Sequence, residues 1–272
     1  MSRARVAIVQ FPGVNCEAET ARALARAGFD AEVFRGTRPA HELGAFDAFV
    51  LPGGFSWQDR VRAGAIAAKD PLLDALAGQA DKGRPVLGIC NGAQVLVEAG
   101  LVPGDGGISL ALARNRMPDR AGYQSRWALC RVEESACIFT RHLEAGTLLP
   151  LPVAHGEGRF TSQKPGALED LAGRGQVPLR YASASGEPAT EYPDNPNGSQ
   201  YAAAAVCNAR GNVLAMMPHP ERVADLGAMA RGVGGAWGAR RDAALERGSD
   251  DAFADGAGML LFRGLHAHMQ EA

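Results

Sequence analysis

Short apolar runs and helix-like segments alternate along the first part of the chain. Four runs have the length and composition of buried strands: 5–11, 31–35, 47–51 and 85–89. Between them, the segments 16–27 and 71–82 are predicted to be helices. Because strands that alternate with helices form parallel sheets, we expect an α/β fold with a mostly parallel sheet and helices on both faces.

The pattern changes in the middle of the chain. Between 108 and 200, β-like runs such as Ala128–Val132 and Leu148–Val153 alternate with Gly- and Pro-containing turns. This pattern predicts an antiparallel β excursion added to an edge of the sheet. Val213–Met217 is predicted to return to the sheet, and Gly258–Met269 to close the chain as an amphipathic helix. We find no internal repeat and expect a single domain over residues 1–272.

The strand Val86–Ile89 leads directly to Cys90, and a helix is predicted over Gln94–Ala99. The frame Gly88-Ile89-Cys90-Asn91-Gly92 has the spacing of a nucleophile elbow, with cysteine in place of serine. The positive end of the helix dipole at such a turn favours a thiolate. The sequence therefore makes Cys90 a candidate nucleophile. The alternative is a small buried apolar residue, which is common for free cysteine.

A thiol nucleophile needs a base, and His219 has a suitable setting. It lies between Pro218 and Pro220, which restrict the backbone to an extended conformation just after a predicted strand. Glu221 follows two residues later and would point to the same side, where it could hold the imidazole. The alternative is a loop histidine beside a solvated carboxylate that pairs with Arg222.

A third candidate element is the turn Pro52-Gly53-Gly54 after another short apolar strand. Two glycines at a strand end can expose backbone amides. The Gly54 and Asn91 amides could then form an oxyanion hole, although an ordinary tight turn has the same residues. Because ligands bind at the carboxyl ends of strands in open α/β sheets, all three elements are expected at one edge.

In this order, the three elements resemble class I glutamine amidotransferases. The segments 11–16, 154–160 and 192–199 resemble, more narrowly, the glutaminase subunits of phosphoribosylformylglycinamidine synthase. The resemblance runs from Val6 to about Arg222. The chain departs from the family pattern at Gln58, at Ala93 and in a Gly/Ala-rich, charged insert at 231–250.

The resemblance implies that Cys90 attacks the carboxamide of L-glutamine, while His219 transfers the thiol proton to ammonia and Glu221 orients the imidazole. It implies further that Gly54 and Asn91 hold the oxyanion. The substrate-binding residues that the resemblance implies are Gly53, Gln94, His155 and Gly156.

The partners and cofactors follow from the same resemblance. Ammonia would pass to a large synthetase subunit, with or without a small accessory subunit, and ATP and Mg²⁺ would bind there, leaving this chain without a cofactor. The segment 109–127 is a candidate docking surface or simply a solvated basic loop. The alternatives are the glutaminase component of another amidotransferase, a cysteine hydrolase of similar fold, and a regulatory subunit.

Composition also indicates which classes of partner are not expected. The 28 Lys and Arg residues nearly balance the 30 Asp and Glu residues, which disfavours nucleic acid as a partner. The sequence has no long apolar stretch and no secretory signal pattern, so we expect no membrane partner and a cytoplasmic location. The five scattered cysteines fit a reducing compartment and show no metal-ligand spacing, so no metal site is predicted.

Overall fold

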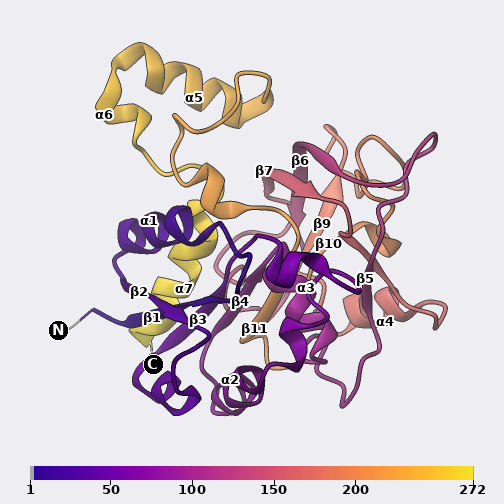
Figure 1. Ribbon diagram of the computed structural model, residues 1–272. Helices are drawn as coiled ribbons and strands as arrows, with labels where there is room; N and C mark the ends of the chain where they lie inside the picture. Colours follow the sequence, from indigo (N-terminus) through magenta and orange to yellow (C-terminus); the bar gives the residue numbers. More distant parts are fainter. Residues whose placement is uncertain (1–2, 272) are drawn as a thin grey trace.

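The fold is organised around one large mixed sheet, seen in the computed structural model, which describes residues 3–271 (Figure 1). The strand order is β2-β1-β3-β4-β11-β10-β9-β6-β7. The first five strands in this order run parallel to one another. Their bounds are Asp30–Arg35 (β2), Arg5–Gln10 (β1), Ala48–Leu51 (β3), Val86–Ile89 (β4) and Val213–Met216 (β11).

Helices cover both faces of this parallel half. Their bounds are Glu17–Ala27 (α1), Pro71–Asp81 (α2), Asn91–Glu98 (α3) and Met259–Glu271 (α7). Helix α1 lies beside α7, and Figure 1 shows α2 and α3 apart from this pair. Helix α1 connects β1 to β2, and helix α2 connects β3 to β4. In the sheet, β2 lies on one side of β1, whereas β4 lies on the opposite side of β3. Because such connections are right-handed, α1 and α2 cover opposite faces of the sheet. Both parts of the predicted α/β architecture are therefore present.

The other four strands extend the sheet in antiparallel fashion beyond β11. They are Ala203–Cys207 (β10), Leu179–Ala182 (β9), Gln124–Val132 (β6) and Leu148–His155 (β7). A small second sheet pairs Ala111–Ala113 (β5) with Arg159–Thr161 (β8). β7 is an edge strand of the large sheet and contains Pro150 and Pro152, residues that an edge strand tolerates better than a central one. The predicted antiparallel excursion is confirmed.

The insert after residue 230 is the part of the fold that sequence patterning did not assign. It forms α5 (Gly235–Arg247), followed by the short α6 (Ser249–Ala252), and extends away from the parallel strands in Figure 1. Trp237 anchors α5, because its indole Nε1 donates a 2.8 Å hydrogen bond to the carbonyl oxygen of Leu148 on the edge strand β7.

The remaining elements are short. They are α4 (Ala167–Gly173) and five 3₁₀ segments: Ala40–Ala45, Ser56–Asp59, Ala67–Lys69, Gln200–Ala202 and Pro220–Val223. Within residues 3–271, no helix combines the length and apolar character needed to cross a bilayer.

Candidate active site

Cys90 occupies a strained turn between β4 and α3. Its backbone has φ 51° and ψ −103°, in a region that L-residues rarely adopt. Helix α3 begins directly after it, at Asn91, rather than at Gln94 as the sequence suggested. The elbow is therefore tighter than predicted, and Cys90 takes the N-cap position at the positive end of the helix.

The two glycines of the elbow are required by close backbone approach. A Cβ added to Gly92 would lie 1.9 Å from the carbonyl oxygen of Leu51, and one added to Gly88 would lie 2.7 Å from that of Gly92. Real Cβ atoms do not come this close to backbone, so only glycine fits at either position. The two glycines therefore allow strand and helix to cross closely at the elbow.

His219 and Glu221 form a buried pair. The imidazole Nδ1 lies 2.6 Å from Oε1 of Glu221. The sequence predicted this contact for the wrong local reason, because Pro220 begins a 3₁₀ turn instead of continuing an extended strand. A proline at the first helical position is pre-organised for that turn. Arg222 pairs with Glu19, at 3.0 Å, rather than mainly with Glu221.

The surroundings of His219 favour its protonated form. Burial alone would lower its pKa, but the negative charge of Glu221 and the thiol of Cys90 outweigh burial and raise the pKa well above the usual value. The other ring nitrogen, Nε2, has no hydrogen-bond partner among the described residues. With Nδ1 held by Glu221, Nε2 is the nitrogen left to exchange a proton with Cys90.

A cavity of about 170 Å³ adjoins Cys90. It is lined by several of the predicted site residues, namely Gly54, Gln94, His155 and Gly156. Gly53 lies instead between His219 and Cys16, where an added Cβ would be 2.7 Å from the imidazole Cε1. A larger cavity, of about 620 Å³, lies between β5 and α4 and is remote from the elbow.

Gln94 is held inside the site rather than on a helix surface. It is 5% exposed, its Nε2 donates to the Glu157 carbonyl oxygen at 2.6 Å, and its Oε1 accepts from Asn91. The Asn91 side chain in turn accepts a hydrogen bond from the Ser56 amide at 3.0 Å. These bonds connect α3 to the glycine turn and to the loop after β7.

His155 is buried at the end of β7 and lines the cavity. Its Nδ1 lies 3.1 Å from Oδ1 of Asn115, a residue of the segment 109–127 that the sequence offered as a docking surface and not as part of the site. Burial, with a further contribution from His219, lowers the pKa of His155 to about 3. His155 is therefore neutral near pH 7, and Nδ1 donates its hydrogen to Asn115.

The cavity also contains three charged residues: Asp59, Glu157 and Arg114. Glu157 belongs to the segment 154–160 that carried the resemblance, whereas sequence reasoning did not assign Asp59 or Arg114 to the site. Burial and the nearby Glu157 carboxylate raise the pKa of Asp59 to about 6. Two carboxylates and one guanidinium beside the nucleophile match the ammonium and carboxylate of an amino acid. Gln58, where the chain departs from the family pattern, precedes Asp59 and adopts a left-handed backbone with φ 60°.

The sequence matches the CobB/CobQ-like glutamine amidotransferase domain over residues 3–243. The chain belongs to this glutamine amidotransferase family. The amidotransferase is 47% identical to phosphoribosylformylglycinamidine synthase subunit PurQ of Methanothrix thermoacetophila, in an alignment that covers 80% of this chain and 86% of that protein. It is 45% identical to the subunit of the same name from Thermus thermophilus, over 81% and 90% of the two chains.

Solved structures agree with this assignment. The amidotransferase superimposes with a TM-score of 0.72 on a chain in the structure of PurLQS from Thermotoga maritima, at 28% identity, covering 98% and 100% of the two chains. A glutamine amidotransferase from the same organism, at 17% identity and a TM-score of 0.53, shares the fold.

Both levels of the resemblance found in the sequence are confirmed. The amidotransferase is an enzyme of the class I type, and its similarity is to the glutaminase subunits of phosphoribosylformylglycinamidine synthase. The alternative families, a different amidotransferase component or a cysteine hydrolase of similar fold, are not favoured by these relatives.

Proposed function

We propose that this chain hydrolyses L-glutamine through a thioester on Cys90 and supplies the ammonia to a separate synthetase subunit that makes formylglycinamidine ribonucleotide in purine biosynthesis. The observation that carries the proposal is the strained Cys90 elbow beside the buried His219–Glu221 pair. These residues supply a nucleophile, a base and a group that orients the base.

The reaction follows from the positions of these groups. Before attack, the thiol proton of Cys90 has moved to Nε2 of His219, whose surroundings favour the protonated ring. The Cys90 sulfur then attacks the side-chain carbonyl carbon of glutamine. The imidazolium then gives this proton to the departing nitrogen as the C–N bond breaks, which releases ammonia. Water, deprotonated by the same imidazole, cleaves the thioester to glutamate and restores the Cys90 thiol. Glu221 stabilises the imidazolium in both halves.

The developing oxyanion is assigned to the backbone amides of Gly54 and Asn91. Gly54 lines the cavity beside Cys90. The amide of Asn91 is in the first turn of α3, where backbone N–H groups have no intrahelical acceptor. Preorganised donors of this kind stabilise the charge that develops in the transition state.

The amino-acid end of glutamine is assigned to the charged part of the cavity. Asp59 and Glu157 would face the α-ammonium group, and Arg114 the α-carboxylate. Gln94, His155 and Gly156 complete the wall. Gln94 and His155 are already hydrogen-bonded within the protein, so they shape the cavity as well as line it. Gly53 contributes by letting His219 approach closely.

The proposed partner is a large synthetase subunit, with or without a small accessory subunit, in the cytoplasm. ATP and Mg²⁺ are assigned to that partner and no cofactor to this chain. Neither a nucleic acid nor a membrane is proposed as a partner. Support comes from the relatives, which are named as subunits of one synthase, and from the similarity to a chain of the solved PurLQS structure. The segment 109–127, which contributes Arg114 and Tyr123 to the cavity, is the proposed docking surface.

The proposal predicts that glutamate release from glutamine rises when the large synthetase subunit is added. Partner docking would order the loops around Gln58 and His155, so the isolated chain should turn over slowly. Steady-state glutamate release, measured with and without the partner, tests this. Equal rates would contradict the idea that partner docking orders these loops. If the folded protein released no glutamate under either condition, the proposed glutaminase activity would be wrong.

The assignment of Asp59 to the α-ammonium group predicts that Asp59→Asn loses activity toward glutamine in particular. A hydrogen bond to a charged group contributes about 1.5–3 kcal/mol, so kcat/KM for glutamine should fall about 10- to 100-fold. Glutaramate, which lacks the α-ammonium group, should lose much less. In the wild-type chain, KM for glutamine should rise as the pH falls through about 6, because Asp59 then loses its charge.

Asp74→Asn is the matched control, because Asp74 is exposed on α2, away from the cavity. It should leave kcat/KM for both amides unchanged. An equal loss for glutamine and glutaramate in Asp59→Asn would show that Asp59 does not recognise the ammonium group.

A further inference from the structure

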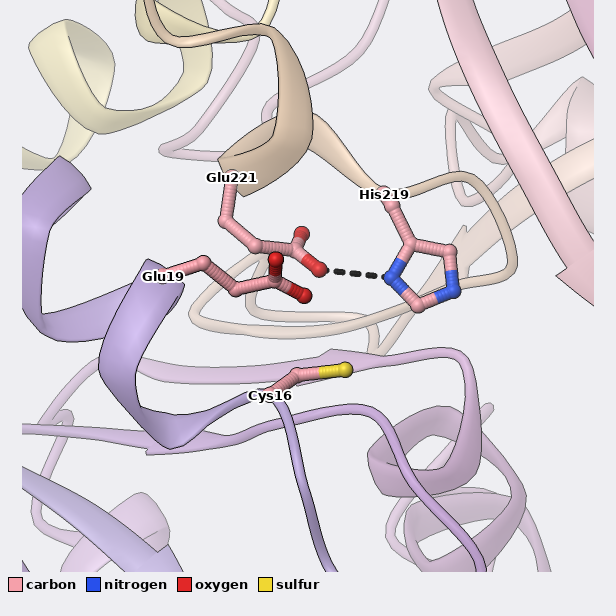
Figure 2. Close-up of side chains that lie close together, drawn as sticks. All are labelled: Cys16, Glu19, His219 and Glu221. Carbon is pink, nitrogen blue, oxygen red and sulfur yellow. Dashed lines mark hydrogen bonds and ion pairs between the residues drawn. The ribbon is translucent and has the colours of Figure 1, made fainter.

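A second thiol lies on the side of His219 that faces Glu221. Cys16, just before α1, and Glu19, in its first turn, meet His219 and Glu221 from the turn after β11 (Figure 2). One potential ligand atom from each of these four residues lies within 4.8 Å of the other three. We refer to Cys16, Glu19, His219 and Glu221 as the Cys16 cluster.

The cluster is buried and incompletely satisfied. Cys16 is 1% exposed, and the Glu221 side chain is 0% exposed. Oε1 of Glu221 bonds to His219, but Oε2 has no hydrogen-bond partner within residues 3–271. A buried carboxylate oxygen without a partner is costly, so the position favours a donor or a cation.

The ligand set is that of a zinc-type ion. A cysteine sulfur, an imidazole nitrogen and carboxylate oxygens are the ligands that Zn²⁺ takes in proteins, commonly four in a tetrahedron. The sequence showed no such spacing because Cys16 and Glu19 are far from His219 and Glu221 along the chain. The set is created only where α1 packs beside the turn that follows β11.

One cation already contacts this cluster. The Arg222 guanidinium donates to the Cys16 sulfur at 3.2 Å and to Glu19 Oε1 at 3.0 Å, and its Nε lies 3.9 Å from Glu221 Oε1. The arrangement thus stabilises positive charge. The Arg222 side chain is 35% exposed, which leaves it a route to solvent when another cation competes.

We propose that the Cys16 cluster is an inhibitory site for a divalent transition-metal ion of the zinc type. The ion binds the Cys16 sulfur, His219 Nδ1 and the carboxylates of Glu19 and Glu221, and it displaces Arg222. Binding exchanges metal-bound waters for these ligands and releases two protons to solvent, one from the Cys16 thiol and one from His219 Nδ1.

Metal binding should inhibit the enzyme because Nδ1 and Nε2 of His219 belong to the same ring. A neutral ring that coordinates metal through Nδ1 carries its proton on Nε2. It therefore cannot accept the proton of Cys90, and Glu221 no longer orients it. This step rests on the proposed role of His219, whereas metal binding itself does not.

Co²⁺ provides a spectroscopic test of binding that is independent of catalysis. In Cys90→Ala, which lacks the proposed nucleophile, Co²⁺ should give one thiolate-to-cobalt charge-transfer band per chain. Adding Cys16→Ser should remove the band. Arg222→Met should tighten Co²⁺ binding, because it removes the competing cation. Absence of the band in Cys90→Ala, or its persistence after Cys16→Ser, would overturn the site.

Zn²⁺ inhibition tests the functional half. Zn²⁺ should inhibit glutamate release by the wild-type chain, and a chelator should restore it. Loss of one ligand in Cys16→Ser or Glu19→Gln should raise the half-inhibiting Zn²⁺ concentration at least about tenfold. Glu19 is partly exposed, so Glu19→Gln gives a reading even where Cys16→Ser folds poorly. An unchanged midpoint in folded variants, despite the Co²⁺ band, would reject inhibition while leaving the metal site.

Discussion

Cys90→Ala is expected to abolish glutamate release, lowering kcat by at least about 10⁴-fold. The loss is this large because no thioester can form, and the amides of Gly54 and Asn91 have no tetrahedral intermediate to stabilise. Glutamate release, assayed with the large synthetase subunit present, measures the change. A variant that kept a tenth of the wild-type rate would show that another group is the nucleophile.

Folding and substrate binding separate this result from a general defect. Alanine removes only the sulfur, and it keeps the Cβ that the elbow already accommodates. We therefore expect Cys90→Ala to bind glutamine and to unfold at nearly the wild-type temperature. Loss of binding together with loss of rate would instead indicate a collapsed site.

Gly92→Ala should give the largest loss of stability among single methyl additions near the site. The new Cβ would lie 1.9 Å from the Leu51 carbonyl oxygen, which is backbone and cannot rotate away. Overpacking commonly costs about 1–3 kcal/mol, and a clash with backbone should reach or exceed the upper end. Denaturant unfolding gives the free energy, and glutamate release should be lost because β3 and the elbow separate.

Gly78→Ala is the matched control, because it adds the same methyl group to helix α2. Apart from its chain neighbours and the backbone of its own helix, no atom lies within 4 Å of a Cβ added to Gly78. Replacing a glycine inside a helix by alanine should stabilise the protein by about 0.5–1 kcal/mol. Equal effects at Gly92 and Gly78 would show that the close crossing of β3 and α3 does not exist.

The local sequence determined the elements of the proposed triad. An apolar strand, a cysteine framed by glycines and a helix form an elbow from neighbouring residues alone. The prolines around His219 restrict its backbone in the same local way, and Glu221 is near enough to reach it. Apolar runs separated by helices likewise determined the parallel half of the sheet. Short apolar runs indicate buried strands, and the helices between them indicate crossovers between parallel strands.

The tertiary structure decided how distant segments converge. Asp59 and Glu157 lie close together only because the loops after β3 and β7 meet at one cavity. The Cys16 cluster likewise exists only where α1 packs against the turn after β11. No periodic pattern encodes such contacts, since each depends on strand order and on side-chain packing between segments far apart in the chain. The sequence by itself therefore determined the proposed nucleophile and its base, whereas the structure determined the charges that surround them.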